Sequence, residues 1–201
     1  MMEWTAFEDQ ARTEGYTCIC GIDEAGRGPL AGPVYAAAVV LRPGQVIEGV
    51  NDSKKLSEKK REALFDTICS QCAAYGIGSA TEKEIDEINI LNATYLAMQR
   101  AVAALPVQTD CALVDGNRAP DLPLEVRTII KGDAQSASIA AASILAKVSR
   151  DRYMLQMAEK YPQYAFEKHK GYGTKLHYER LEQYGISPIH RLSFLKKWMN
   201  R

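Results

Sequence analysis

The fold is decided by residues 19–34, which read Ile19-Cys20-Gly21-Ile22-Asp23-Glu24-Ala25-Gly26-Arg27-Gly28-Pro29-Leu30-Ala31-Gly32-Pro33-Val34. An apolar run rich in strand-forming residues, from Tyr16 to Ile22, ends on two adjacent carboxylates. A loop with three glycines, two prolines and one arginine follows, and a second apolar run begins at Val34. This pattern predicts a strand over Tyr16–Asp23, a constrained loop, and an antiparallel strand over Val34–Leu41.

The two carboxylates, Asp23 and Glu24, mark a candidate site. Neighbouring residues of a strand face opposite sides. The two acids are therefore expected to share a site only if the strand ends between them, and Gly26 could provide the turn. Adjacent acids beside glycines that admit another backbone point to a hard metal ion next to a phosphate.

Two other interpretations of this stretch are weaker. Residues 26–31 formally fit the G-x-G-x-x-[G/A] fingerprint of dinucleotide-binding proteins. That fingerprint must open a helix, which Pro29, Gly32 and Pro33 would break, and the two acids would repel a pyrophosphate. A plain hairpin is the second alternative, but the loop is longer than a hairpin needs.

The rest of the chain alternates between strands and helices, which predicts an α/β fold. Three further strands are expected over Ala73–Ala80, Cys111–Val114 and Glu125–Ile130. Helices are expected around Trp4 and Ala11, from Ser57 to Cys72, over Glu82–Leu105, from about Asp133 to Tyr161, from Thr174 to Gly185, and over His190–Arg201. The sequence therefore predicts a mixed five-stranded sheet flanked by helices.

Acidic residues recur where these strands end. Asp23, Asp115 and Asp133 each end a strand or follow one directly, and strand ends are where open α/β sheets place ligands. Taken singly, Asp115 before Gly116 also suits a turn, and Asp133 also suits a helix N-cap. Two unit charges about 5 Å apart repel by roughly 3 kcal/mol at an effective dielectric of about 20, so four such carboxylates together require cations or else raised pKa values. Oxygen ligands favour Mg²⁺ or Mn²⁺, and two ions about 4 Å apart suit an in-line displacement.

Seven short motifs together resemble ribonuclease HII in its bacterial form. They run in the order of that family over nearly the whole chain: residues 23–34 (DEAGRGPLAGPV), 52–56 (DSKKL), 114–116 (VDG), 131–133 (KGD), 143–151 (SILAKVSRD), 171–174 (GYGT) and 187–191 (SPIHR). The resemblance implies an RNase H-like catalytic domain over residues 1–160 and a C-terminal helical, substrate-binding extension over residues 161–201, and we expect the two to form one continuous structural unit.

The resemblance also implies an activity and a set of site residues. The expected enzyme cuts the RNA strand of RNA–DNA hybrids and single ribonucleotides in duplex DNA, leaving 3′-hydroxyl and 5′-phosphate ends. By resemblance, Asp23, Glu24, Asp115 and Asp133 hold two metal ions, Mg²⁺ or Mn²⁺. The stretch Gly26-Arg27-Gly28 resembles the family's sensor of the ribose 2′-hydroxyl, the group that distinguishes RNA from DNA. Tyr172 resembles a tyrosine that stacks on the deoxyribose after the ribonucleotide.

Lys54 is a further candidate because it precedes the expected N-terminus of the helix after Ser57. A cation is mildly unfavourable there, and a bound phosphate would reverse that effect. A solvated surface lysine is the alternative. Three histidines, His169, His177 and His190, have no ligand spacing, and we expect them to be structural.

Length, charge and cysteine content fit this interpretation. The chain has 201 residues, enough for one sizeable core. Residues 1–146 carry 13 basic and 20 acidic residues, and residues 147–201 carry 12 and 5, so a basic C-terminal part, including Lys168 and Lys170, could meet phosphates. Five cysteines without scaffold spacing favour reduced thiols and a cytoplasmic location. No apolar run approaches the length of a membrane span. We expect a monomer that binds RNA–DNA hybrids and ribonucleotide-containing duplex DNA.

The sequence is compatible with two other function classes. One is a different RNase H-like nuclease, such as a resolvase, for which the sensor would have no task; cleavage of all-DNA substrates would support it. The other is a binding module without catalysis. The presence of all four acids counts against it, and a titration that detects no metal binding would favour it.

Overall fold

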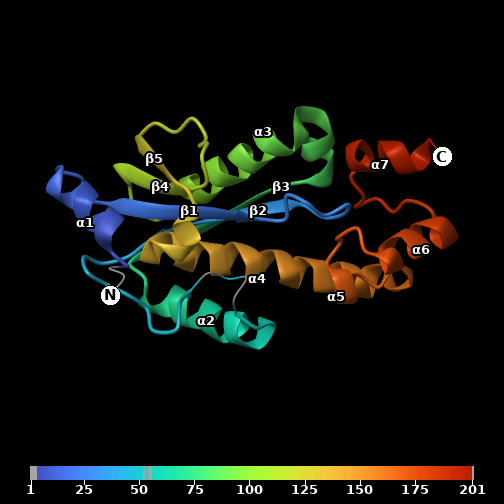
Figure 1. Ribbon diagram of the computed structural model, residues 1–201, viewed down its shortest axis with the longest axis horizontal. Helices are drawn as coiled ribbons and strands as arrows, with labels where there is room; N and C mark the ends of the chain where they lie inside the picture. Colours follow the sequence, from blue (N-terminus) through green and yellow to red (C-terminus); the bar gives the residue numbers. More distant parts are fainter. Residues whose placement is uncertain (1–3, 52, 54–55, 201) are drawn as a thin grey trace.

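A mixed five-stranded sheet lies at the centre of the computed structural model, which describes residues 4–51, 53 and 56–200 (Figure 1). Its order is β3-β2-β1-β4-β5. The strands are β1 (Ile19–Ala25), β2 (Val34–Val40), β3 (Ala74–Ala80), β4 (Cys111–Asp115) and β5 (Glu125–Ile129). The pairs β1–β2 and β2–β3 are antiparallel, whereas β1–β4 and β4–β5 are parallel. The predicted fold class is confirmed.

Helices cover both faces of the sheet and one end of it. They are α1 (Ala6–Thr13), α2 (Glu58–Gln71), α3 (Glu82–Ala103), α4 (Ala137–Lys160), α5 (Phe166–His169), α6 (Lys175–Tyr184) and α7 (Leu192–Met199). Helix α3 lies on one face, α2 and α4 lie on the other, and α5 to α7 gather at the end opposite α1 (Figure 1). Among the described helices, none is both long and apolar enough to span a bilayer.

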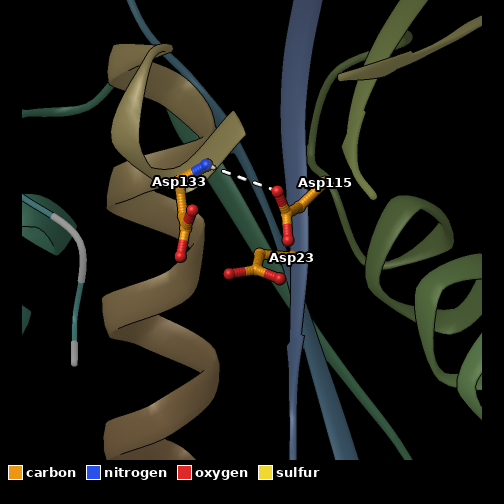
Figure 2. Close-up of side chains that lie close together, drawn as sticks. All are labelled: Asp23, Asp115 and Asp133. Atoms are coloured by element: carbon orange, nitrogen blue, oxygen red, sulfur yellow. Dashed lines mark hydrogen bonds between the residues drawn. The ribbon is translucent and has the colours of Figure 1, made fainter. Parts of the chain in front are cut away.

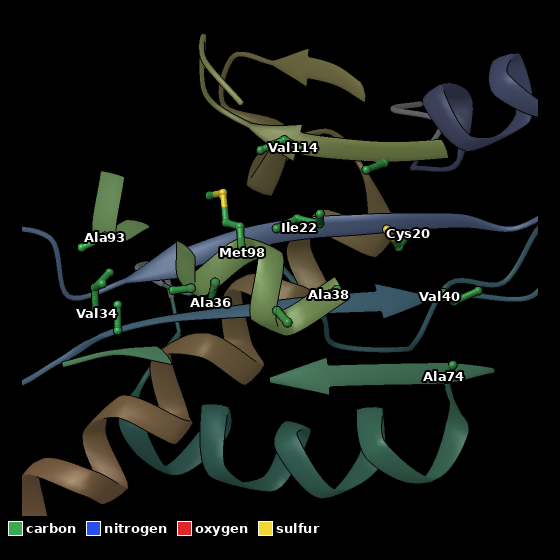
Figure 3. Close-up of a cluster of buried hydrophobic side chains, with 14 of the residues drawn as sticks. Cys20, Ile22, Val34, Ala36, Ala38, Val40, Ala74, Ala93, Met98 and Val114 are labelled. Atoms are coloured by element: carbon green, nitrogen blue, oxygen red, sulfur yellow. The ribbon is translucent and has the colours of Figure 1, made fainter. Parts of the chain in front are cut away.

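The alternation of side chains along the central strands builds two cores. Ile22, Ala36 and Ala38 face α3, where Met98 packs against them (Figure 3). Their neighbours Ala37 and Val39 face α2 and α4. The backbone of α4 lies directly against β1, because a Cβ on Gly21 would stand 2.3 Å from the Ile139 nitrogen. The small residues of α4 therefore allow the helix to approach the strand that carries Asp23.

Element boundaries differ from the predictions where side chains replace backbone pairing. Strand β1 begins at Ile19 rather than Tyr16, because the Asp110 carboxylate accepts hydrogen bonds from the Thr17 and Cys18 amides (2.8 and 3.0 Å). Helix α4 begins at Ala137 rather than about Asp133, with Ser136 as its N-cap. Helix α2, capped by Ser57, and helix α6, capped by Thr174, match the predictions within a residue.

The C-terminal segment packs on the glycine-rich loop as well as on α4. One buried cluster joins Leu30 and Ala31 of that loop to Met154 of α4 and to residues of the segment itself: Tyr164, Phe166, Leu181, Ile189 and Leu195. Two backbone bonds, Leu30 N to Gly171 O and Gly32 N to Ile189 O, reinforce this contact (2.8 and 2.9 Å). The loop is therefore held between the sheet and the C-terminal helices.

Candidate active site

Three aspartates that are distant in sequence meet at one edge of the sheet. Asp23 lies on β1, Asp115 is the last residue of β4, and Asp133 lies in a short 3-10 turn, Gly132–Ala134 (Figure 2). One carboxylate oxygen from each lies within 4.8 Å of the others. Strands β1 and β4 are parallel, so their carboxyl ends reach the same edge. The structure thus brings together three of the four predicted acids.

Asp115 also holds the turn that carries Asp133. Its Oδ1 accepts hydrogen bonds from the Gly132 amide (2.6 Å) and the Asp133 amide (3.4 Å). Lys131 adopts a left-handed conformation at the start of this turn, with φ of 57°. Asp133 is therefore placed by a turn between β5 and α4, not by the start of α4 that the sequence suggested.

The surroundings of Asp23 disfavour its negative charge when no cation is bound. Asp23 is buried, and its pKa is raised well above the ordinary value, chiefly by burial and then by the charges of Glu24 and Asp115. The Glu24 amide, which donates to Asp23 Oδ1 at 2.7 Å, opposes this rise. A hard divalent cation would offset the repulsion, and an oxygen-only ligand set fits Mg²⁺ or Mn²⁺.

Glu24 reaches this region from the opposite face of β1. The strand continues through both acids, pairing Asp23 with Ala37 and Glu24 with Ala36, so the expectation that it must end between them is wrong. Strand β1 extends beyond its pairing with β4, since the last β1–β4 pair is Ile22 with Val114 and β1 continues to Ala25. Beyond that pair the side of β1 towards β4 is open, and Glu24 lines the same cavity as Asp23 and Asp115.

This cavity has a volume of about 260 Å³ and joins the acids to the predicted substrate-binding residues. Gly26, Arg27, Gly28 and Tyr172 line it. Arg27 forms an ion pair with Glu24, at 3.3 Å between Nη1 and Oε1. Asp23, Glu24 and Asp115 therefore share one pocket with the Gly26-Arg27-Gly28 stretch and Tyr172. Lys54 lies outside the described residues.

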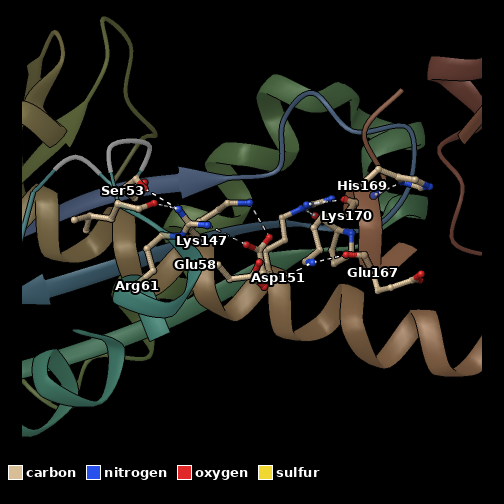
Figure 4. Close-up of polar contacts among 12 residues, drawn as sticks. Ser53, Glu58, Arg61, Lys147, Asp151, Glu167, His169 and Lys170 are labelled. Atoms are coloured by element: carbon tan, nitrogen blue, oxygen red, sulfur yellow. Dashed lines mark hydrogen bonds and ion pairs between the residues drawn. The ribbon is translucent and has the colours of Figure 1, made fainter. Parts of the chain in front are cut away.

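Two cations in the cavity wall were not singled out in the sequence. Lys147 of α4 and Arg61 of α2 line the cavity beside Ser53. Lys147 Nζ donates to Asp151 at 2.7 Å, and Arg61 donates to the Ser53 carbonyl at 3.0 Å (Figure 4). Lys147 belongs to the 143–151 motif, so that motif contained the signal. Both side chains place positive charge near a site that would receive phosphates.

The conformation of the Gly26-Arg27-Gly28 loop, the predicted 2′-hydroxyl sensor, depends on Gly26. Its φ is +98°, and a Cβ there would stand 2.1 Å from Arg150 Nε. Gly28, in contrast, has no positive φ, and a Cβ there would make only an ordinary contact, 3.8 Å from the Tyr172 ring. A methyl group on Gly28 would therefore narrow the pocket without straining the backbone.

Two buried arginines hold this loop from behind. Arg150 donates to the carbonyls of Pro33, Ala31 and Lys170 at 3.0–3.1 Å. Arg191 donates to the carbonyls of Gly32, Arg27 and Gly26 at 2.8, 3.0 and 2.6 Å. Both arginines are fully buried. Neither was a predicted site residue, although Arg150 belongs to the 143–151 motif and Arg191 to the 187–191 motif.

Tyr172 is fixed by its backbone while its ring stays accessible. The side chain is among the exposed large hydrophobics, at 42% exposure, and Arg150 Cζ lies 5.8 Å from the ring centroid. The Tyr172 carbonyl lies 2.9 Å from His177 Nδ1, and its amide donates to the His169 carbonyl at 2.9 Å. The ring is thus presented to the pocket from an anchored turn.

The histidines behind Tyr172 form a hydrogen-bonded chain with one consistent set of tautomers. The Ser187 amide donates to His190 Nδ1 (2.9 Å), so the proton of His190 lies on Nε2, which faces His177 Nε2 at 2.9 Å. His177 then carries its proton on Nδ1 and donates it to the Tyr172 carbonyl. Burial lowers the pKa of both His177 and His190 to about 4. The expectation that these histidines are structural agrees with this arrangement.

Comparison with known proteins identifies the family. The family model described as Ribonuclease HII matches residues 20–197. The chain belongs to the ribonuclease HII family. A ribonuclease HII from Caldicellulosiruptor bescii is 59% identical over 189 residues, covering 94% of this chain and 92% of that protein. A ribonuclease HII from Marinomonas sp. is 61% identical over 177 residues, covering 88% and 89%.

A solved structure agrees with this assignment. The crystal structure of the ribonuclease H2 from Pyrococcus horikoshii OT3 is 30% identical, with a TM-score of 0.73, and the match covers 88% of this chain and 93% of that one. Ribonucleases HII are metal-dependent endoribonucleases, and the chain is an enzyme of this class. The acidic cluster at the sheet edge is consistent with that dependence on a divalent metal.

Proposed function

We propose that this ribonuclease HII cuts the RNA strand of RNA–DNA hybrids and nicks duplex DNA on the 5′ side of a single embedded ribonucleotide. The observation that carries the proposal is the shared pocket: a carboxylate cluster, a glycine-arginine-glycine loop and an exposed tyrosine within one cavity. A purely DNA-cutting nuclease would need the acids but would have no use for a sensor of the 2′-hydroxyl.

The acids would hold two divalent ions. Asp23, Asp115 and Asp133 are the central ligands, and Glu24 reaches from the rim of the pocket. When bound, the ions would activate a water and stabilise the departing oxygen. Water oxygen bonds to phosphorus as the bond between phosphorus and the 3′ oxygen breaks, leaving 3′-hydroxyl and 5′-phosphate ends. This suits a role in removing ribonucleotides from DNA.

The remaining pocket residues would position the substrate. The amides around Arg27 would meet the 2′-hydroxyl, and Tyr172 would stack on the following deoxyribose. Lys147 and Arg61 would face phosphates, with Lys54 as a further proposed contact. We assign residues 1–160 to catalysis and residues 161–201 to substrate binding, in a cytoplasmic monomer whose five cysteines are free thiols.

One assay tests this function. The protein is incubated with Mg²⁺, and separately with Mn²⁺, and with a duplex DNA that contains one ribonucleotide, and the cut is mapped on both strands. We expect a single nick 5′ of the ribonucleotide and no cleavage of the matched all-DNA duplex. Equal cleavage of both duplexes would favour a different RNase H-like nuclease, and binding without cleavage would favour a non-catalytic module.

A further inference from the structure

Arg191 contacts the backbone of the Gly26-Arg27-Gly28 loop without lining the substrate pocket. Its guanidinium donates to the Gly26 and Arg27 carbonyls, at 2.6 and 3.0 Å. The side chain is fully buried and does not line the cavity that Gly26, Arg27 and Gly28 line. Arg191 therefore contacts the backbone of the sensor without reaching the position that a substrate would occupy.

The two carbonyls fix the direction of two amides. In a trans peptide the C=O and the following N–H point in opposite directions, and the described residues contain no cis peptide. Because the carbonyls of Gly26 and Arg27 accept hydrogen bonds from Arg191, the N–H groups of Arg27 and Gly28 point away from Arg191. Arg27 and Gly28 line the cavity, whereas Arg191 does not. Within the described part of the chain, neither amide donates a hydrogen bond.

The neighbouring loop amides behave differently. The Leu30 amide donates to Gly171 O at 2.8 Å, and the Gly32 amide donates to Ile189 O at 2.9 Å. The Leu30 and Gly32 amides are thus used for folding. The Arg27 and Gly28 amides, whose peptide planes are held by Arg191, remain available to a hydrogen-bond acceptor on a substrate. A cation on each carbonyl also polarises its peptide group, which makes the attached N–H a stronger donor.

We propose that Arg191 is the positioning residue for 2′-hydroxyl recognition, because it orients and polarises the Arg27 and Gly28 amides from behind the loop. This inference rests on the proposed function of the pocket. Arg150 performs the matching task for the other wall. It holds the Lys170 carbonyl and lies beside the Tyr172 ring. On the loop it donates to the Ala31 and Pro33 carbonyls and packs against Gly26, but it donates to neither the Gly26 nor the Arg27 carbonyl, so it is the matched control for Arg191.

The test compares Arg191→Lys with Arg150→Lys. Lysine keeps the positive charge but cannot reproduce the planar fork of donors. Both changes are made in an Asp23→Asn background, so that binding is measured without turnover. Fluorescence anisotropy gives the Kd for a duplex with one ribonucleotide and for the matched all-DNA duplex. The readout is the ratio of these two constants, which general loosening of the fold would not change selectively.

We expect Arg191→Lys to reduce the preference for the ribonucleotide by about tenfold, with little change in the Kd for all-DNA duplex. Arg150→Lys should weaken both duplexes and preserve the ratio. An unchanged ratio in Arg191→Lys would overturn the inference. If the protein with Arg191 intact shows no preference for the ribonucleotide, the proposed function fails instead.

A second measurement needs no variant at Arg191. Amide hydrogen exchange in the unmodified protein should be fast at Arg27 and Gly28 and slow at Leu30 and Gly32. In the Asp23→Asn protein, the ribonucleotide duplex should slow exchange at Arg27 and Gly28 more than the all-DNA duplex does. Protection of these two amides in the free protein would contradict the geometry, even if Arg191→Lys does not fold.

Discussion

Asp115 performs two separable tasks, and substitutions can distinguish them. Its charge belongs to the metal cluster, and its Oδ1 accepts the amides that hold the Gly132–Ala134 turn. Asparagine retains an oxygen acceptor, whereas alanine retains neither charge nor acceptor. Asp115→Asn should therefore abolish most cleavage with stability nearly unchanged. Asp115→Ala should also lose about 1–3 kcal/mol of the free energy of unfolding, because two buried amides lose their acceptor.

Denaturant unfolding of both variants checks this prediction. Equal stability of Asp115→Asn and Asp115→Ala would show that the turn does not depend on the carboxylate. The hydrogen bonds to Gly132 and Asp133 would then be incidental.

The sensor offers a second comparison at single residues. Arg27→Ala removes a half-exposed side chain and leaves the backbone amides in place. Gly28→Ala adds a methyl 3.8 Å from the Tyr172 ring, at a residue without positive φ, so the free protein should fold normally. We expect Gly28→Ala to slow cleavage at a single ribonucleotide more than Arg27→Ala does. Steady-state kinetics on that substrate measures the loss of kcat/KM in each variant. A larger loss in Arg27→Ala would mean that the guanidinium itself senses the sugar.

At the scale of elements, the histidine chain joins the turn at Tyr172 to the loop before α7. Its hydrogen bonds require neutral rings, and His177 and His190 each have a folded pKa of about 4 against an ordinary value of 6.5. Above pH 6.5 both states of the protein hold neutral rings. Between pH 6.5 and 4 these two histidines are protonated in the unfolded protein but stay neutral in the folded protein. Stability should fall there by up to about 1.4 kcal/mol per pH unit for each histidine, and level off below pH 4.

Urea unfolding between pH 7 and 4 tests this pH dependence. The control is the double variant His177→Gln, His190→Gln, which lacks both titrations. The buried Asp23, whose raised pKa acts in the opposite direction, is present in both proteins, so its effect cancels in the comparison. Parallel stability profiles would rule out a neutral histidine chain.

Sequence patterns predicted the elements well because their causes are local. A few consecutive residues are enough to recognise strand propensity, the helix caps Ser57 and Thr174, and the acids that follow strands. The two arginines behind the sensor were missed for the opposite reason. Arg150 and Arg191 bind carbonyls that lie 117 and 165 residues away, at Pro33 and Gly26, so their burial follows from tertiary packing alone. The continuation of β1 past Asp23 likewise depends on its pairing with β2.

For the whole molecule, the salt dependence of binding reports which cations meet the phosphates. Lys147 lines the pocket, whereas Lys170 is not among the residues that line it and is a weaker candidate than the sequence suggested. Lys147→Gln should reduce the slope of log affinity against log salt by about 0.9, the value of one neutralised phosphate. Lys83→Gln is the control, because that side chain is exposed on α3 and lies outside both the pocket and residues 161–201. Equal slopes for Lys147→Gln and the unmodified protein would remove Lys147 from the interface.

The arrangement of the molecule concentrates negative charge at one sheet edge, where three aspartates from β1, β4 and the Gly132–Ala134 turn converge. Without a cation this cluster opposes folding, since burial and neighbouring charges raise the pKa of Asp23. Replacing Asp23 by asparagine should therefore leave the metal-free protein as stable as the original, or slightly more stable. A bound ion, in contrast, should stabilise only the protein that retains the full cluster.

The most direct test is the midpoint of thermal unfolding, measured against Mg²⁺ or Mn²⁺ concentration in the absence of nucleic acid. For the unmodified protein it should rise with concentration, as expected for a ligand that binds only the folded state. For Asp23→Asn it should start equal or higher and rise much less. Two results would contradict the assignment of this cluster as the metal centre. One is an unfolding midpoint of the unmodified protein that does not change with either metal. The other is a rise in the midpoint of Asp23→Asn equal to that of the unmodified protein.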